Sequence, residues 1–363
     1  MTAITELYKP DTTFLNINAM RLNLLFIFIA MVFLLPACRR QENPVIVLKK
    51  DLPAKTIKGE DLNIPNLIAP TRIYFTEKSL LFKDNKSPEA QMYVYNPVSQ
   101  KMNKFIKKGR GPGEMLGAFY FAQLDSNKTT LIYDITLDKI LKADTDSLLH
   151  QEYYPTELFE CEGISRRISC ICGYGNRLIA LGNFEDARIV ELVQGDSLQV
   201  LARYIPDTRK NRISDFQLQA FEGVIKANNT RQACVIACRY ADQLEIVDLV
   251  RGTPLIIKGP ECFEPQYQVV TIGGGRALAH EEDERKGYVD VCCNDDYIYA
   301  LYSGRFTNER NSSYGNIIRV FDWEGNYITN YMLDNEIISI DVVPDGQIIF
   351  GASSEGTIIK YSL

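Results

Sequence analysis

Residues 288–333 contain four short runs of strand-forming residues, and this pattern most constrains how the chain can fold. The runs read YVDVCC, YIYALY, IIRVFD and YITNYML, and each is bounded by Asn, Asp, Gly or Ser. Runs rich in Val, Ile and Tyr favour half-buried strands, and the residues between them favour tight turns. Four antiparallel strands in about 45 residues have the size of one blade of a β-propeller.

The four-run pattern recurs in five further units. Their first runs are TRIYFT from Thr71, AFYFAQL from Ala118, RISCIC from Arg167, FEGVIKA from Phe221 and IISIDVV from Ile337. In the second unit the last run is expected at residues 148–154 (LLHQEYY). No stretch has sustained helical periodicity, so only short helical turns are expected, near residues 213–221 and 276–286. The sequence therefore predicts an all-β, six-bladed β-propeller of four-stranded antiparallel blades.

The sixth unit has only three runs, which would leave an open sheet edge. Two strand-like segments precede the first unit: residues 44–50 (PVIVLKK) and 54–59 (AKTIKG). We expect one of them to pair with residues 357–361 and to close the ring as an N-terminal strand.

Residues 20–38 have the pattern of an export signal. An Arg is followed by an apolar run over residues 24–35, which is shorter than the roughly 20 residues that span a bilayer. The run ends in Leu35-Pro36-Ala37-Cys38, which resembles the lipobox of bacterial lipoproteins. The resemblance implies a leader over residues 1–37, with the signal peptide starting near Met20, and lipidation of Cys38. An uncleaved signal anchor is the alternative.

These features predict a three-part chain: the leader, a tether over residues 38–52 that could contain the closing strand, and a propeller over residues 53–363. Multiple acyl chains anchor a protein firmly. The expected location is the bacterial cell envelope, with the lipid anchor in the outer membrane and the protein facing the periplasm or the surface. The net charge of -6 argues against nucleic acid as a partner.

The connection after the first unit reads KKGRGPGEMLG, residues 107–117. Its Gly-Arg-Gly-Pro-Gly-Glu run, from Gly109 to Glu114, resembles the TolB-like six-bladed propeller lipoproteins of Bacteroidetes. That family implies a propeller in the envelope and offers no catalytic mechanism to carry over. The glycines and the proline permit a sharp bend. Arg110 and Glu114 either pair to fix this bend or face a ligand.

The long irregular segments are expected on one face. Strand direction alternates within a blade, so the second-to-third loops and the connections between blades emerge on the same side, where binding usually occurs. The candidate ligand-binding residues there are Arg110, Glu114, Arg276, Arg305 and Tyr314. Arginine and aromatic side chains suit carboxylated or hydroxyl-rich ligands. We hypothesise that Arg110, Arg305 and Tyr314 line the mouth of the central channel; alternatively, each Arg pairs with a nearby acid.

No catalytic or metal site is predicted. The two histidines, His150 and His280, form no HExxH motif, and no G-x-S-x-G motif occurs. Of nine cysteines, Cys38 is assigned to the lipid, and none has C-x-x-C spacing. The others are expected to be buried thiols, with a disulfide involving Cys161 or Cys262 as the alternative.

The sequence thus favours an envelope-anchored propeller that binds a glycan, a peptide or a partner protein through its long-loop face, without catalysis or a cofactor. The alternative is a six-bladed hydrolase or lactonase with a cation such as Ca²⁺ in the channel, for which Glu222, Asp290 and Asp341 are the available carboxylates. A structural component of an envelope assembly is a third possibility.

Overall fold

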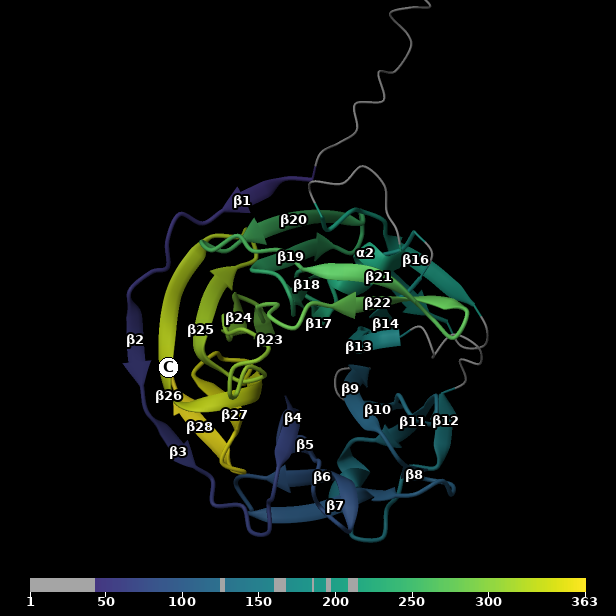
Figure 1. The fold of residues 1–363 in the computed structure, drawn as a ribbon. Coiled ribbons are helices and arrows are strands. Elements are labelled where there is room, and N and C mark those ends of the chain that lie inside the picture. The colour runs from purple at the N-terminus through teal and green to yellow at the C-terminus, as the bar shows by residue number, and fades with distance from the viewer. Residues whose placement is uncertain (1–42, 125–127, 160–167, 185, 194–196, 208–214) are drawn as a thin grey trace, which may run out of the picture. The chain divides into compact units, whose positions relative to one another are not determined.

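The computed structural model describes residues 43–124, 128–159, 168–184, 186–193, 197–207 and 215–363. The leader, Cys38 and Cys161 lie outside these residues. Asn43–Leu363 form one unit in which antiparallel sheets surround a common axis (Figure 1). The predicted all-β, six-bladed architecture with four-stranded blades is confirmed.

The first four blades each form a separate sheet. Blade one contains β4 (Pro70–Phe75), β5 (Leu80–Asp84), β6 (Ala90–Asn96), β7 (Lys101–Lys108) and the short β8 (Glu114–Met115). Blade two contains β9 (Ala118–Leu124), β10 (Thr129–Asp134), β11 (Lys139–Asp144) and β12 (Glu157–Phe159). Blade three contains β13 (Ile168–Tyr174), β14 (Arg177–Gly182), β15 (Ile189–Leu192) and β16 (Leu198–Ala202). Blade four contains β17 (Gly223–Asn228), β18 (Ala233–Cys238), β19 (Gln243–Asp248) and β20 (Thr253–Lys258).

Blades five and six share one long strand, β26 (Tyr327–Val342). Blade five contains β23 (Tyr288–Cys293), β24 (Tyr297–Tyr302), β25 (Gly315–Asp322) and the first part of β26. Blade six contains the second part of β26, β27 (Ile348–Ser353), β28 (Ile358–Ser362) and β3 (Gly59–Asp61).

The innermost strands contact one another in cyclic order, from β4 through β9, β13, β17, β23 and β26 back to β4. Two hydrogen bonds join the first blade to the last. The backbone N–H of Ile73 donates to Ser339 Oγ at 3.0 Å, and that of Phe75 donates to Asp341 Oδ2 at 2.6 Å. Polar side chains of β26 therefore satisfy backbone donors of β4, which would otherwise be buried without partners.

The N-terminal segment runs along the outer side of three blades (Figure 1). The strand β1 (Val45–Val47) pairs in parallel with β20, and β2 (Ala54–Ile57) pairs in parallel with β26. Next, β3 pairs antiparallel with β28, so that Gly59 lies opposite Tyr361. Of the two segments expected to pair with the last strand, residues 54–59 reach it at their end, whereas residues 44–50 lie on blade four. There Ile46 packs beside Leu255 and Gly325.

Two local predictions were wrong. Residues 148–154 do not form the outer strand of blade two, because η1 (Asp146–Leu149) and a loop occupy this position and β12 supplies the strand. The 3₁₀ turn begins where Ser147 N–H donates to Asp144 Oδ1 at 2.8 Å. Residues 276–286 contain the strand β22 rather than a helical turn. The other expected turn is present as the helix α2 (Asp215–Ala220).

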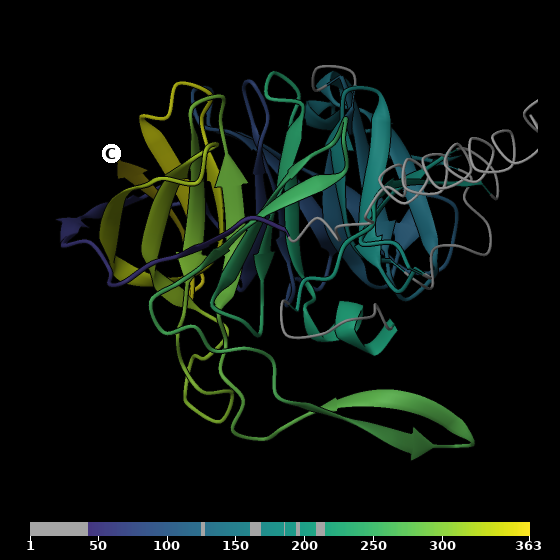
Figure 2. The ribbon, with the colours of Figure 1, turned by 90° about the horizontal axis from the view of Figure 1, so that it is seen from above.

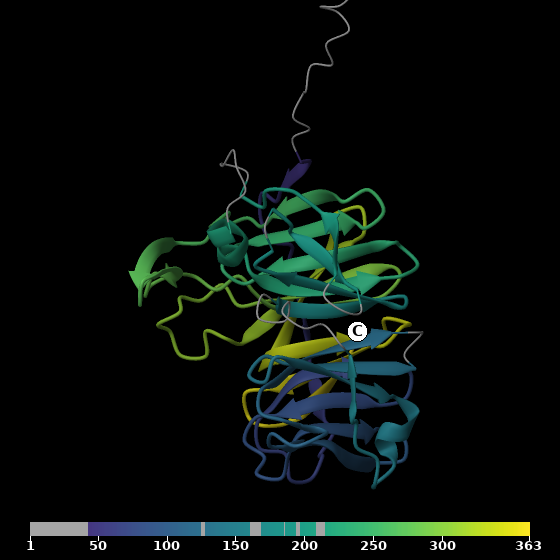
Figure 3. The same cartoon turned by 90° about the vertical axis from the view of Figure 1, so that its right-hand side faces the viewer.

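The described long segments around blades four and five gather on one face, as predicted, while residues 160–166 of the predicted segment after blade two lie outside the described residues. The hairpin of β21 (Tyr267–Ile272) and β22 (Gly275–His280) projects from this face beside the blade-five loop, residues 303–314 (Figures 2 and 3). The opposite face has mostly tight turns, but the connection over residues 145–156, which contains η1, is an exception. We call the first face the long-loop face.

No helix in the described residues is long and apolar enough to cross a bilayer. The seven described cysteines are free thiols. Five of them are buried, as expected, while Cys293 is half-buried and Cys262 is exposed.

Gly173 is required where blade three meets blade two. A Cβ at this position would overlap the backbone carbonyl of Gln123 on β9. We expect Gly173→Ala to lower the free energy of unfolding by about 2 kcal/mol, because the two inner strands must separate. Gly275→Ala is the control, since a Cβ there lies in nearly open space. Equal urea midpoints for the two variants would contradict the expectation.

Candidate functional site

The central channel is narrow and filled by side chains. Its cavity of about 20 Å³ holds about one water molecule. Lys226 Nζ lies 3.9 Å from Asp341 Oδ1 and 4.4 Å from the centre of the Tyr74 ring. Asp290 Oδ2 accepts hydrogen bonds from Ser339 Oγ at 2.5 Å and from the N–H of Ile340 at 3.0 Å. The interior of the channel is therefore a packed polar core.

The three carboxylates considered for a channel cation are engaged separately. Asp290 and Asp341 bind the groups just described, and Glu222 pairs with Arg239 at 3.4 Å. Among the residues that the structure describes, no three His, Cys, Asp or Glu side chains are grouped as metal ligands.

At the long-loop end of the channel, the inner strands have bulges in five of the six blades. The residues that the ladders skip are Arg72, Phe119, Ser169, Val289 and Ile338. Only the ladder of β17 is continuous. A bulge bends its strand and redirects a side chain. Arg72 also has a positive φ of 49°, which is uncommon for a side chain of its size.

Arg72 forms the first of two cationic groups at this end. Its guanidinium lies 5.0 Å from the centre of the Phe119 ring and 4.8 Å from that of Tyr120. Lys83 Nζ lies 5.3 Å from the same Phe119 ring. Burial and the neighbouring charge of Arg72 lower the pKa of Lys83 to about 8. Two cations thus share one aromatic ring.

The second group is formed by Arg239 and Lys286. Lys286 Nζ donates to the Tyr240 hydroxyl at 2.9 Å and lies 4.2 Å from the centre of that ring. Burial, and then the charge of Arg239, lower the pKa of Lys286 to about 8. Burial raises the pKa of Tyr120 to about 12, and this hydroxyl lies within the electrostatic influence of both Arg72 and Arg239. Arg72 Nη2 also donates to the Tyr120 hydroxyl at 3.4 Å.

We call Arg72, Lys83, Arg239 and Lys286 the cationic mouth. Carboxylates also act on it: the charge of Asp134 opposes the lowering of the pKa of Lys83, and the charges of Glu222 and Glu284 oppose that of Lys286. Glu222 already pairs with Arg239. Glu284 is occupied as well, because its carboxylate contacts His280 Nδ1 at 2.6 Å and accepts from the N–H of Gln266 at 2.9 Å. Positive charges held together under partial burial raise the free energy of the empty site, and such groups occur often at functional sites.

A cavity of about 330 Å³ lies beside the cationic mouth. It is lined by Glu222, by Leu218 of α2, and by Leu278 and His280 of the hairpin. Asn183 also lines it, and the buried Oδ1 of this side chain has no hydrogen-bond partner among the described residues. The His280 ring stacks on Tyr240 at 4.0 Å, so the hairpin joins the cavity to the mouth. A ligand whose anionic group binds at the mouth could place a hydroxyl group in the cavity, where it would donate to Asn183 Oδ1.

Arg110 and Glu114 lie in the connection from blade one to blade two. Glu114 Oε2 accepts from the N–H of Gly111 at 2.8 Å, and the carboxylate fills the space beside Gly109. Glu114 therefore fixes the bend from within. Arg110 is exposed. No ion pair joins Arg110 to Glu114 in the described part of the chain.

Arg276, Arg305 and Tyr314 lie in the loops of blades four and five. Arg305 Nη1 donates to Glu336 at 2.6 Å, and its other terminal nitrogen contacts the same carboxylate. Arg276 lies 5.0 Å from the centre of the Phe216 ring, and Tyr314 is half-buried with its backbone N–H bonded to Asn311. No hydrogen bond or ion pair between described residues links any of the five predicted site residues.

Comparison with known proteins places this arrangement in a family. The model of a family described as TolB-like 6-blade propeller-like matches residues 49–345, most of the chain. The chain belongs to this family.

Two solved structures share the fold. A member of the duf4221 family from Bacteroides vulgatus has a TM-score of 0.54 at 9% identity, over 86% of this chain and 97% of that one. A Bacteroides fragilis protein, crystallised as a candidate exported protein, has a TM-score of 0.52 at 13% identity, over 87% of this chain and 98% of that one. A search of curated proteins finds no match.

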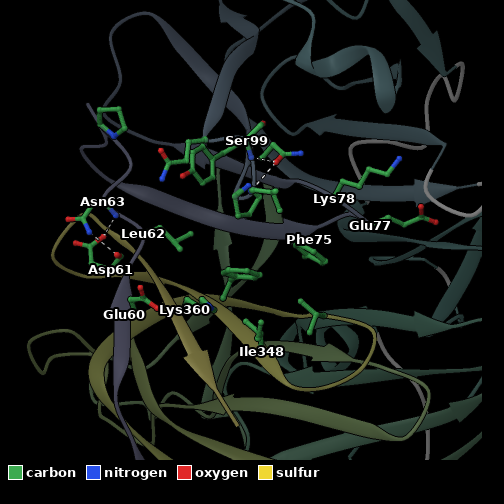
Figure 4. Close-up of a pocket in the computed structure, with 18 residues that line it drawn as sticks. Glu60, Asp61, Leu62, Asn63, Phe75, Glu77, Lys78, Ser99, Ile348 and Lys360 are labelled. Atoms are coloured by element: carbon green, nitrogen blue, oxygen red, sulfur yellow. Dashed lines mark hydrogen bonds and ion pairs between the residues drawn. The ribbon is translucent and has the colours of Figure 1, made fainter.

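The TolB-like propeller also has a groove on the face opposite the long loops. Its volume is about 1100 Å³, and it lies between blades one and six (Figure 4). Lys360 of the wall lies 3.9 Å from Glu60, and Asp61 accepts from the N–H of Asn63 at 2.7 Å. Glu77 and Lys78 add one charge of each sign to the wall, so the groove does not gather charges of one sign. The cationic mouth, where like charges meet, is the stronger candidate site.

Proposed function

We propose that this TolB-like propeller is an envelope-anchored lipoprotein that binds a carboxylate-bearing ligand at the cationic mouth, without catalysis. A carboxylated glycan, an acidic peptide or an acidic segment of an envelope protein has the required chemistry. Cys38 would carry the lipid, and the outer membrane would be the site of anchoring. The lipobox-like run before Cys38 supports the lipid anchor.

The cationic mouth is the observation that supports binding. Burial and a neighbouring arginine both disfavour the charged form of Lys83 and of Lys286, and this unfavourable electrostatic energy falls when an anion arrives. Planar guanidinium groups bind carboxylates through two hydrogen bonds. The aromatic rings of Phe119, Tyr120 and Tyr240 offer flat apolar surfaces beside the charges.

The arrangement favours binding over hydrolysis. Hydrolysis of a glycoside commonly uses two carboxyl groups that flank one bond. At the mouth, Glu222 is paired with Arg239 and Glu284 contacts His280. Both carboxylates therefore have their own partners, and the cations outnumber them.

Replacing Lys286 by methionine should separate binding from stability. We expect Lys286→Met to weaken binding of oligogalacturonate, a carboxylated oligosaccharide, by about 10- to 100-fold, because a charged hydrogen bond contributes about 1.5–3 kcal/mol. The unfolding free energy should not fall, since the lost ammonium group was held at an unfavourable position. Titration calorimetry and urea unfolding measure the two effects.

The same titration should depend on pH. Both mouth lysines are protonated below about pH 8 and lose their charge as the pH rises through that value. The affinity should therefore fall at least about tenfold between pH 7 and pH 9. Lys104→Met is the matched control, because Lys104 lies on β7 at the outer side of blade one and pairs with Glu89. Binding that is independent of pH and unchanged in Lys286→Met would rule out the cationic mouth as the site.

A further inference from the structure

The chain enters the propeller at the outer rim of blade four. The strand β1 pairs with β20, and the N–H of Ile256 donates to the carbonyl of Pro44 at 2.9 Å. Asn43 Nδ2 donates to the carbonyl of Ile205 at 3.4 Å, in the connection after blade three. These contacts fix the start of the described chain to one edge of the ring.

Covalent geometry limits how far this edge can lie from a lipid attached to Cys38. Asn43 is the fifth residue after Cys38. Five residues span at most about 18 Å in any conformation. We propose that the outer rim of blade four rests on the bilayer surface, so that the propeller sits edge-on to the membrane. This inference depends on the lipid anchoring proposed above.

The side chains on this rim suit a lipid surface. Val45 and Val47 on β1 are 41% and 55% exposed, and Val250 in the turn between β19 and β20 is 69% exposed. Single exposed valines are common, but here three of them lie along the edge that carries the entering chain. Lys49 and Lys50 follow on the same segment and are exposed. Lysines beside apolar residues suit an interface with anionic headgroups.

The turn that carries Val250 is held rigidly. The side-chain carboxylate of Asp248 accepts from the N–H groups of Val250 and Arg251 at 2.8 and 2.9 Å. Gly252 has a φ of 67° and lies against the backbone of Leu201 on β16. The rim therefore presents Val250 in a defined position. When the outer rim of blade four rests on the bilayer, the channel axis is parallel to the membrane plane. The cationic mouth then opens parallel to the membrane surface.

Tryptophan quenching tests the orientation. The chain has one tryptophan, Trp323, which is 7% exposed and gives the background signal. The variants Val250→Trp and Val98→Trp, each as the lipidated mature protein, would be placed in phosphatidylethanolamine–phosphatidylglycerol vesicles with brominated acyl chains. Val98 lies in the corresponding turn of blade one and is 94% exposed. We expect at least twofold stronger quenching of the new tryptophan in Val250→Trp.

Mass spectrometry of the N-terminal peptide tests the lipid anchor on Cys38 independently of the edge-on orientation. An acylated Cys38 together with equal quenching at both positions, or stronger quenching at position 98, would overturn the edge-on orientation alone. A Cys38 without acyl chains would overturn the anchor and this inference with it. Val47→Trp provides a second position on the blade-four rim and should behave like Val250→Trp.

Discussion

Glu245→Ala is expected to lower the free energy of unfolding by about 3–5 kcal/mol, because it leaves a buried arginine without its counter-charge. Arg188 Nε lies 3.0 Å from Glu245 Oε2, and the two side chains are 2% and 0% exposed. The hydroxyl of Tyr204 donates to the same carboxylate at 2.5 Å, and Gln243 Nε2 donates at 3.1 Å. Although burial alone would lower the pKa of Arg188, the charge of Glu245 raises it.

The pair joins blade three to blade four. Arg188 precedes β15, and Glu245 lies on β19. The surface pair of Arg177 and Glu191 is the matched control, because it has a similar geometry at 3.2 Å but is partly exposed. Glu191→Ala should cost less than about 1 kcal/mol. The double variant Arg188→Leu/Glu245→Leu should recover part of the loss, since it removes both charges. Equal losses in the two single variants, measured by urea unfolding, would contradict the assignment.

Asp134→Ala is expected to have the next largest effect, about 3–4 kcal/mol, because it leaves four backbone donors without their acceptor. Asp134 is 0% exposed at the end of β10. Its carboxylate accepts from the N–H groups of Leu116, Gly117, Thr136 and Leu137, at 2.7, 3.1, 2.8 and 2.9 Å. The Asp134 side chain thus fixes both the turn after β10 and the connection from blade one to blade two.

Asp134→Asn should cost less than Asp134→Ala, because the amide keeps one acceptor oxygen. Asp248→Ala serves as the partly exposed comparison, since Asp248 bonds to the backbone of its own turn. We expect a loss of about 1 kcal/mol there. Thermal or urea unfolding would give the ranking. Asp134→Asn with the same loss as Asp134→Ala would show that the negative charge, rather than the hydrogen-bond geometry, determines the effect.

The blades could be predicted from the sequence because strand propensity and turn chemistry are local. Runs such as YIYALY and IIRVFD became β24 and β25. The outer strand of blade two was misplaced because another interaction competes locally. Asn103 Nδ2 on β7 donates to the carbonyls of Leu148 and His150 at 2.7 and 2.9 Å, which draws this segment towards blade one. No local pattern encodes that contact.

The cationic mouth could not be predicted, because tertiary pairing creates it. Arg72 and Lys83 lie in runs that read as ordinary strands, and Lys286 lies in a charged stretch that resembles a solvated turn. The bulge at Arg72 is visible only once β4 is paired with β5. Conversely, Arg305 was predicted to bind a ligand because it lies in a long loop. Its guanidinium instead binds Glu336 on β26. Arg305 thus follows the alternative prediction, in which a loop arginine pairs with an acid. The acid, Glu336, is more distant in the sequence than expected.

Because Gly59 pairs with Tyr361, blade six can be completed only after the strand β28 has been synthesised. The outer strand of blade six, β3, is made before any blade on the ribosome, and its partner β28 is made only after the other strands of the propeller. Contacts between residues so far apart in sequence form slowly and leave incomplete chains prone to misassembly. A nascent chain therefore has to keep Gly59–Asp61 unpaired until Ile358–Ser362 emerge. A chain that lacks β28 would leave both β27 and β3 without a partner on that side, although β28 has only five residues.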